Sequence, residues 1–209
     1  MVNLEKTLSV KTEKEKPPFL YHASSNKELK QIVPSRIRHR DKNEGPLVFA
    51  STDKQFLTCF LTRIDDSWGQ IGRYDSNGQI IYTFCVLDKE RFMNLDKGGA
   101  IYKVSSEDFD LNITQGLEEW TTKKPVEVLD KEIYDSSLDA MMENDVRVYF
   151  CNKEQLEEIR ANTKNFPKTF EILDGIKSEN EKRGIATSIS EIVDIGETGL
   201  EPATSTSQT

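Results

Sequence analysis

The sequence predicts a mixed α+β fold, with a largely antiparallel, split sheet and a few short helices. Short apolar and aromatic runs with strand character outnumber the helical patterns, and the two kinds do not alternate regularly along the chain. Neither a Gly-x-Gly-x-x-Gly sequence nor a P-loop sequence is present. The sequence therefore argues against a doubly wound domain that binds nucleotides through those motifs.

The folded domain is predicted to extend from Pro18 to Ile176. Residues 1–17 mix Lys and Glu with few large apolar side chains, so burial cannot offset the entropy lost on ordering, and we expect a disordered leader. Residues 177–209 are polar and end in a stretch with few bulky side chains, which predicts a disordered tail. A domain of about 160 residues can bury most of its apolar surface without disulfides or metals.

Strands are predicted where β-branched and aromatic residues form short runs bounded by Gly, Pro or Asn. The run Gln79–Leu87 is almost continuously apolar, which is typical of a central strand. Gly98-Gly99 is expected to supply a turn with positive φ before the strand that follows. The predicted strands are Phe19–His22, Leu47–Ala50, Gln79–Leu87, Ala100–Val104, Glu118–Thr122, Val126–Tyr134 and Val146–Phe150.

Helices are predicted where apolar residues recur every three or four positions after a residue that can cap a helix. The cluster Ser51-Thr52-Asp53 caps the longest of these patterns in the first half of the chain. The predicted helices are Glu28–Ile32, Lys54–Ile64, one turn at Asp88–Phe92, Asp135 or Ser136 to Met142, and Lys153–Ala161, with Phe166–Ile176 extending the fold. Residues 65–78 contain three glycines and are expected to form a long loop.

The composition predicts a cytoplasmic protein that does not bind DNA or RNA. The net charge of −8 disfavours a nucleic-acid backbone as partner, although residues 35–42 form a local basic run. No apolar run approaches the roughly 20 residues of a membrane span, so no membrane is expected. The odd number of cysteines predicts three reduced, buried thiols at Cys59, Cys85 and Cys151. No spacing of acidic residues predicts a metal site.

Three sequence features occur in an order that suggests a site. The first is Tyr21-His22-Ala23-Ser24 at the end of a strand, the second is Gly45–Cys59 running from a strand into a helix, and the third is Glu118-Glu119-Trp120 opening a late strand. This order resembles the ADP-ribosyltransferase fold, including its diphtheria-toxin and poly-ADP-ribose polymerase branches. The chain is also similar to a group of uncharacterised bacterial proteins that share the phrases LYHAS, GPLVFAS, GGAIY and EW.

The resemblance implies a protein that binds NAD and acts at the nicotinamide–ribose bond, with a small-molecule nucleotide and a possible protein acceptor as partners. Glu119 would stabilise the positive charge that develops on the ribose, and the Glu118-Glu119 doublet leaves this register open by one residue. His22 would hold a ribose hydroxyl, and the backbone at Ala23 would bind the nicotinamide amide. The other residues implied in cofactor binding are Tyr21, Ser24, Phe49 and Ser51.

Other interpretations of the same residues remain open. His22 also fits a buried structural histidine, and Glu119 also fits a surface carboxylate. The polymerase branch has a stacking Tyr where this chain has Val48, which suggests a non-catalytic binding module or a scaffold of the same fold. A further branch removes 2′-phosphates from RNA, and its phosphate-binding role could fall to Arg36, Arg38, His39, Arg40 or Arg73. Trp68 is expected either to anchor a loop on the core or to form part of a lid.

Overall fold

The structure, a computed structural model, describes residues 16–35, 45–63, 67–76, 78–112 and 119–188 of the chain. Nearly all paired strands are antiparallel, and short helices lie between and outside the sheets, which confirms the predicted α+β class. The strands are β1 (Phe19–Ser24), β2 (Gln31–Ile32), β3 (Val48–Ala50), β4 (Gly69–Ser76), β5 (Gln79–Val86), β6 (Gly99–Ser105), β7 (Asp110–Asn112), β8 (Glu119–Thr122), β9 (Val126–Glu127), β10 (Asp130–Tyr134) and β11 (Arg147–Phe150). The helices are α1 (Lys54–Thr58), α2 (Lys89–Leu95), α3 (Ser137–Glu143), α4 (Lys153–Ala161) and α5 (Phe166–Lys182).

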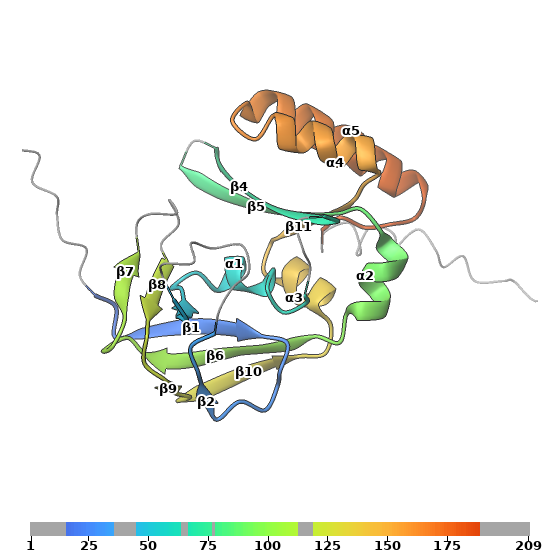
Figure 1. Ribbon diagram of the computed structural model, residues 1–209. Helices are drawn as coiled ribbons and strands as arrows, with labels where there is room; N and C mark the ends of the chain where they lie inside the picture. Colours follow the sequence, from blue (N-terminus) through green and yellow to red (C-terminus); the bar gives the residue numbers. More distant parts are fainter. Residues whose placement is uncertain (1–15, 36–44, 64–66, 77, 113–118, 189–209) are drawn as a thin grey trace, which may run out of the picture.

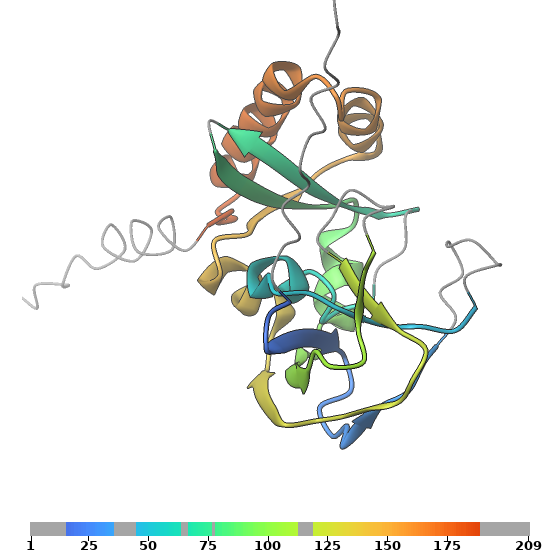
Figure 2. The ribbon, with the colours of Figure 1, turned by 90° about the vertical axis from the view of Figure 1, so that its left-hand side faces the viewer.

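The elements are stacked in layers that two perpendicular views show in the same order (Figures 1 and 2). The sheet β1-β6-β10 lies at the base, α1 and α3 lie above it, and the sheet β11-β5-β4 lies above these helices. Helices α4 and α5 cover the outer face of that upper sheet. Separate apolar clusters fill the spaces between the layers, so each sheet has a buried face.

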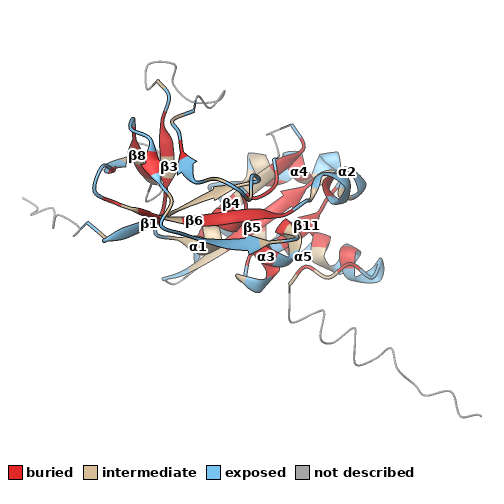
Figure 3. Cartoon of the chain, turned by 90° about the horizontal axis from the view of Figure 1, so that it is seen from below, coloured by how far each residue is buried: buried red, intermediate tan, exposed pale blue. Residues whose placement is uncertain are grey.

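Strand β6 is the central strand of the basal sheet and is buried along most of its length (Figure 3). The turn before it depends on Gly98, which has the predicted positive φ, at +63°. A Cβ atom at this position would lie 2.0 Å from the carbonyl oxygen of Tyr134, so only glycine fits without moving the backbone. Gly98 therefore fixes the corner through which α2 leads into β6.

A second apolar cluster lies on the other face of the basal sheet, against two smaller sheets, β3-β8-β7 and β2-β9. Trp120 on β8 and Tyr102 on β6 are the largest side chains in this cluster. The predicted helix over Glu28–Ile32 is absent, and β2 is found there instead. The Asn26 side chain accepts the backbone N–H of Glu28 at 3.0 Å, and the Tyr102 hydroxyl accepts that of Leu29 at 3.1 Å, which holds the segment in turns.

The predicted loop over residues 65–78 is wrong for Gly69–Ser76, which form β4 and pair with the whole of β5. Glycine has a packing role here. A Cβ atom at Gly72 would lie 2.5 Å from the Oγ1 of Thr83 and 2.6 Å from the ring of Tyr74, so the glycine makes room for those side chains. The predicted central position of the following strand is confirmed, since β5 lies between β4 and the parallel strand β11.

Several helix boundaries differ from the predictions. Helix α1 ends at Thr58 rather than Ile64, α2 is longer than the predicted turn, and the predicted strand Val126–Tyr134 is divided into β9 and β10. Strand β7 was not predicted. The predicted caps are found, because Asp53 and Ser136 each accept a backbone N–H in the first turn of the following helix. All three cysteines are unpaired and buried, as predicted.

Helix α5 crosses the boundary predicted at Ile176. Asn180 is completely buried, and its amide donates to the carbonyl oxygen of Phe150 at 3.1 Å. Beyond the helix, Ile185 belongs to the cluster under the upper sheet, and the carbonyl of Thr187 accepts the N–H of Val148 at 3.0 Å on the β11 edge. The packed part of the chain therefore extends beyond Ile176, at least as far as Thr187. Residues 189–209 lie outside the described residues, as does the leader before Lys16.

Candidate functional site

Strand pairing brings the three predicted site motifs onto three neighbouring strands. Ser51, just after β3, exchanges two backbone hydrogen bonds of 2.9 Å with Tyr21 on β1. On its other side, β3 pairs with β8, where Ala50 lies opposite Trp120. Strand β3 therefore separates the strand that carries the candidate histidine from the strand that carries the candidate glutamate, a distance of two strand spacings, or about 10 Å.

Glu119 is the first residue of β8 and is partly buried. Continuing the β3–β8 register by one residue places it opposite Ser51, and on the other side it pairs with Asn112 of β7. The neighbouring Glu118 lies outside the described residues. The choice between Glu118 and Glu119 as the catalytic carboxylate therefore stays a prediction from the sequence.

His22 is held by one short hydrogen bond to the neighbouring strand. Its Nδ1 lies 2.7 Å from the carbonyl oxygen of Phe49. A carbonyl oxygen can only accept, so Nδ1 carries the hydrogen, and in the neutral ring Nε2 is an acceptor. Burial lowers the pKa of His22 below its ordinary value, although the bond to Phe49 acts in the opposite sense. The imidazole is therefore neutral at pH 7, with a fixed orientation.

The bond made by His22 occupies the point where the pairing of β1 with β3 stops. Two residues after the Tyr21–Ser51 pair, the antiparallel register brings Ala23 opposite Phe49, but the Phe49 carbonyl is taken by the imidazole. Because bonded and non-bonded pairs alternate along an antiparallel strand, the N–H and C=O of Ala23 point towards β3 rather than β6. The bridge recorded between these two segments is Tyr21–Ser51, and the described residues show no bridge between Ala23 and Phe49.

The side chains of the predicted site divide between two faces. Phe49, Ser51 and Glu119 share one face, opposite the buried face that carries Ala50 and Trp120. His22 begins on the buried face, where it pairs with Tyr102, but its Nδ1 bond to the backbone of β3 places the ring edge between the strands. The two candidate catalytic side chains thus approach the gap between β1 and β3 from different sides.

Tyr21 and Ser24 make contacts that stabilise the fold. The Tyr21 ring packs with the cluster under α1 and lies 4.8 Å from the Nζ of Lys54. The Ser24 hydroxyl accepts the backbone N–H of Asn26 at 3.1 Å.

The sequence analysis missed a polar network beside this site. Asp53, two residues after Ser51, accepts the hydroxyl of Tyr82 at 2.6 Å, and that hydroxyl accepts the Nε–H of Arg73 at 3.3 Å. The capping pattern identified Asp53, but Tyr82 lies in an apolar run and Arg73 in a segment expected to be a loop. Only the packing of β4 and β5 over α1 joins the three. The other arginines considered for phosphate binding, with His39, lie outside the described residues.

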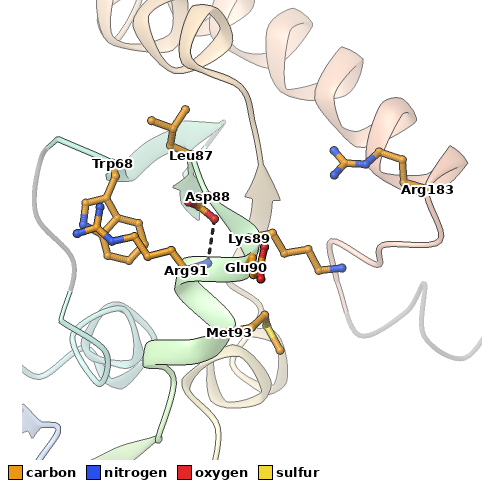
Figure 4. Close-up of a pocket in the computed structure, with 8 residues that line it drawn as sticks. All are labelled: Trp68, Leu87, Asp88, Lys89, Glu90, Arg91, Met93 and Arg183. Carbon is orange, nitrogen blue, oxygen red and sulfur yellow. Dashed lines mark hydrogen bonds between the residues drawn. The ribbon is translucent and has the colours of Figure 1, made fainter.

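A surface hollow of about 740 Å³ lies away from this site, near the start of α2 and the end of α5 (Figure 4). Its lining residues are Trp68, Leu87, Asp88, Lys89, Glu90, Arg91, Met93 and Arg183. Trp68 is buried in the cluster under the upper sheet, with the Arg91 guanidinium 4.3 Å from its ring, so it anchors its segment to the core. None of the predicted site residues lines this hollow.

Comparison with known proteins shows no matching protein family, curated protein or solved structure. In the described ranges, no three His, Cys, Asp or Glu side chains gather in a way that could hold a metal ion. None of the helices in those ranges is both long enough and apolar enough to span a membrane.

Proposed function

We propose that this chain binds NAD at the gap between β1 and β3 and acts at the nicotinamide–ribose bond, as an ADP-ribosyltransferase does. The observation that carries the proposal is the end of the β1–β3 pairing at Tyr21 and Ser51, beyond which the backbone N–H and C=O of Ala23 point towards β3. A primary carboxamide has one acceptor oxygen and two N–H donors, so it can accept from the first group and donate to the second. The nicotinamide of NAD carries such a group.

The neighbouring side chains suit the reaction that would follow. When the bond between ribose C1′ and the nicotinamide nitrogen breaks, nicotinamide leaves with the electron pair, and positive charge develops on the sugar. The carboxylate of Glu119 would stabilise that charge, and a nucleophile such as water or an acceptor side chain would then attack C1′ and release a proton. Because Nδ1 of His22 is bonded to Phe49, Nε2 would accept a hydrogen bond from a ribose hydroxyl and orient the sugar.

A specific observation favours a second function, a binding module that does not turn NAD over. Val48, which stands where the polymerase branch has its stacking Tyr, is 1% exposed and belongs to the core. Phe49 is the aromatic residue on the face of Ser51 and Glu119, and it is only partly buried. The approach of His22 and Glu119 from different sides of the strands also favours binding without catalysis.

The carboxamide interaction can be tested by calorimetry with NAD and with its deamido form, in which a carboxylate replaces the amide. We expect deamido-NAD to bind roughly 10-fold more weakly or worse, because a carboxylate cannot donate a hydrogen bond to the carbonyl of Ala23. Equal affinity for the two compounds would show that Ala23 does not bind the amide, and the absence of NAD binding would remove the proposed function.

Turnover is tested by measuring nicotinamide release from NAD by the wild-type protein and by Glu119→Gln. For an enzyme, we expect this substitution to slow the release by on the order of 100-fold or more. Glu154→Gln, which removes an exposed carboxylate on α4, should leave the rate unchanged. Binding of NAD without any release by the wild type would favour the binding module, and release unaffected by Glu119→Gln would exclude that residue from the mechanism.

A further inference from the structure

Arg73 extends from β4 with an exposed side chain, and a series of hydrogen bonds ties it to the start of α1. Its Nε–H donates to the Tyr82 hydroxyl at 3.3 Å, and that hydroxyl donates to Oδ2 of Asp53 at 2.6 Å. The other carboxylate oxygen of Asp53 accepts the backbone N–H of Phe56 at 3.0 Å. Both oxygens of Asp53 are therefore engaged, and the arginine is bonded to the tyrosine rather than directly to the carboxylate.

Tyr82 is a rigid anchor for this arginine. It is 3% exposed, lies directly opposite Arg73 in the β4–β5 ladder and packs against Phe56 with 5.5 Å between ring centroids. Burial, together with the hydrogen bond to Asp53, raises the pKa of Tyr82 to about 12. The hydroxyl therefore keeps its proton at neutral pH, and its hydrogen-bond directions stay the same.

This anchoring leaves the outer edge of the guanidinium available. The Nε–H is the group that Tyr82 holds, and among the described residues the N–H groups on the two terminal nitrogens have no partner. An arginine fork of this kind matches two oxygens of a phosphate group in a bidentate contact. Because Tyr82 already restricts the side chain, binding an anion would cost less conformational entropy than it would at a freely rotating arginine.

The position of the network relates it to the candidate site. Asp53 donates its backbone N–H to the Ser51 hydroxyl at 3.0 Å, and Ser51 is the residue that pairs with β1. The amide-binding gap lies at Phe49 and the arginine network begins at Asp53, so four residues, on the order of 13 Å of extended chain, separate the two. An extended ligand with a carboxamide at one end and a negative charge further along could reach both.

We infer that Arg73 binds the diphosphate of a dinucleotide ligand whose carboxamide lies at Ala23, and that Tyr82 positions it for this contact. The inference rests on the proposed function, because it uses the same gap as the other end of the ligand. The contact at Arg73 would distinguish a dinucleotide from nicotinamide alone. A ligand with a carboxamide and a diphosphate would be bound at both groups, whereas nicotinamide would be bound at its carboxamide only.

The test is calorimetry with three probes, NAD, nicotinamide and inorganic pyrophosphate, on the wild-type protein and on Arg73→Gln. We expect the substitution to weaken NAD and pyrophosphate binding by roughly 10-fold or more, because a charge-assisted, bidentate contact is lost, and to leave nicotinamide binding unchanged. Arg147→Gln is the matched control. Arg147 is exposed on β11 in the same sheet, but its register with Thr83 places it on the opposite face from Arg73 and Tyr82.

The variant Tyr82→Phe tests whether the Tyr82 hydroxyl positions Arg73 for anion binding or only stabilises the fold. It keeps the ring that packs on Phe56 but removes the hydroxyl that holds Arg73, so we expect weaker pyrophosphate binding even where circular dichroism shows a folded protein. Arg73→Lys keeps the charge but loses the planar fork, and should restore only part of the affinity. A purely structural network would instead change the thermal midpoint of these variants and leave their affinities for pyrophosphate equal to that of the wild type, which would overturn the inference.

The outcomes separate this inference from the proposed function. If NAD and nicotinamide bind but Arg73→Gln has no effect, the inference is overturned and the proposed function stands. If pyrophosphate binds in an Arg73-dependent manner but NAD and nicotinamide do not bind, the proposed function fails while the arginine remains an anion-binding residue. If none of the three probes binds, both are overturned.

Discussion

The carboxylate of Asp96 connects separate parts of the chain. Its two oxygens accept the backbone N–H groups of Ser137 and Leu138 at the start of α3, at 2.7 and 3.1 Å, and that of Gly98 at 3.0 Å. It also accepts the hydroxyl of Thr62 at 3.3 Å. One side chain thus joins the end of α2, the turn before β6 and the start of α3.

These contacts predict a stability that depends on pH. Burial acts to raise the pKa of Asp96, but the hydrogen bonds from Ser137, Gly98 and Leu138 outweigh it, and the folded-state pKa is lowered. The stabilisation is therefore complete above the unfolded pKa of an Asp, about 3.9, and is lost as the pH falls through the lower folded value. At pH 7 we expect Asp96→Asn to lower the free energy of unfolding by about 1–3 kcal/mol, which urea denaturation would measure.

The pH dependence distinguishes the charge from the shape of the side chain. The difference between wild type and Asp96→Asn should begin to shrink below about pH 4, where the carboxyl of the unfolded chain takes up a proton, and should shrink further as the pH falls towards the lower folded-state pKa. Asp139→Asn, an exposed position in the first turn of α3, should change the unfolding free energy by at most a few tenths of a kcal/mol. A difference for Asp96→Asn that is the same at pH 7 and pH 3 would contradict this account.

Among the elements, β4 shows how tertiary packing overrides local sequence signals. Its glycines predicted a loop, yet Gly72 lies in a paired strand because Thr83 and Tyr74 occupy the space beside it. We expect Gly72→Ala to destabilise the protein by about 1–3 kcal/mol, since the new methyl group must displace buried side chains.

A second glycine supplies the control for this prediction. Gly175 lies in α5, and nothing lies within 4 Å of the position that a Cβ atom would take there. Gly175→Ala should therefore stabilise the protein by about 0.5–1 kcal/mol through helix propensity alone. Chemical denaturation of both variants measures the two free energies of unfolding. A stability for Gly72→Ala equal to that of the wild type would mean that Tyr74 and Thr83 can move aside without cost.

At the scale of the whole molecule, the segment that follows Ile176 is part of the fold as far as the structure describes it, although its composition predicts a disordered tail. Asn180, Ile185 and Thr187 are at most 7% exposed, and residues 185–188 lie beside the core and the β11 edge. A protein cut after Ile176 would lose these contacts and expose the face of the upper sheet that they cover.

Two truncations test this boundary. We expect removal of residues 177–209 to lower the free energy of unfolding by several kcal/mol, since it removes the buried side chains of Asn180, Ile185 and Thr187 and the end of α5. A protein that ends at Ser188 keeps every buried residue that the structure describes, so it should be more stable than the protein cut after Ile176. If the protein that ends at Ile176 is as stable as the protein that ends at Ser188, the domain boundary predicted at Ile176 is correct.

The sequence by itself determined the class of the fold and the position of most of its elements. The caps at Asp53 and Ser136, the central strand Gln79–Leu87 and the helix Lys153–Ala161 follow from residue types and periodicity over a few positions, which local interactions decide. The same local patterns identified the strands that carry His22 and Glu119, although β1 continues two residues beyond the predicted end at His22.

The tertiary structure alone decided which of these groups meet. The imidazole of His22 bonds to the Phe49 carbonyl where the recorded pairing of β1 with β3 ends, and the pairing of strands distant in sequence has no local signal. Likewise Arg73 and Asp53 are joined only because β5 places Tyr82 between them. Local patterns reflect the propensities of single segments, whereas a site of this kind depends on register and packing between segments that are far apart in the chain.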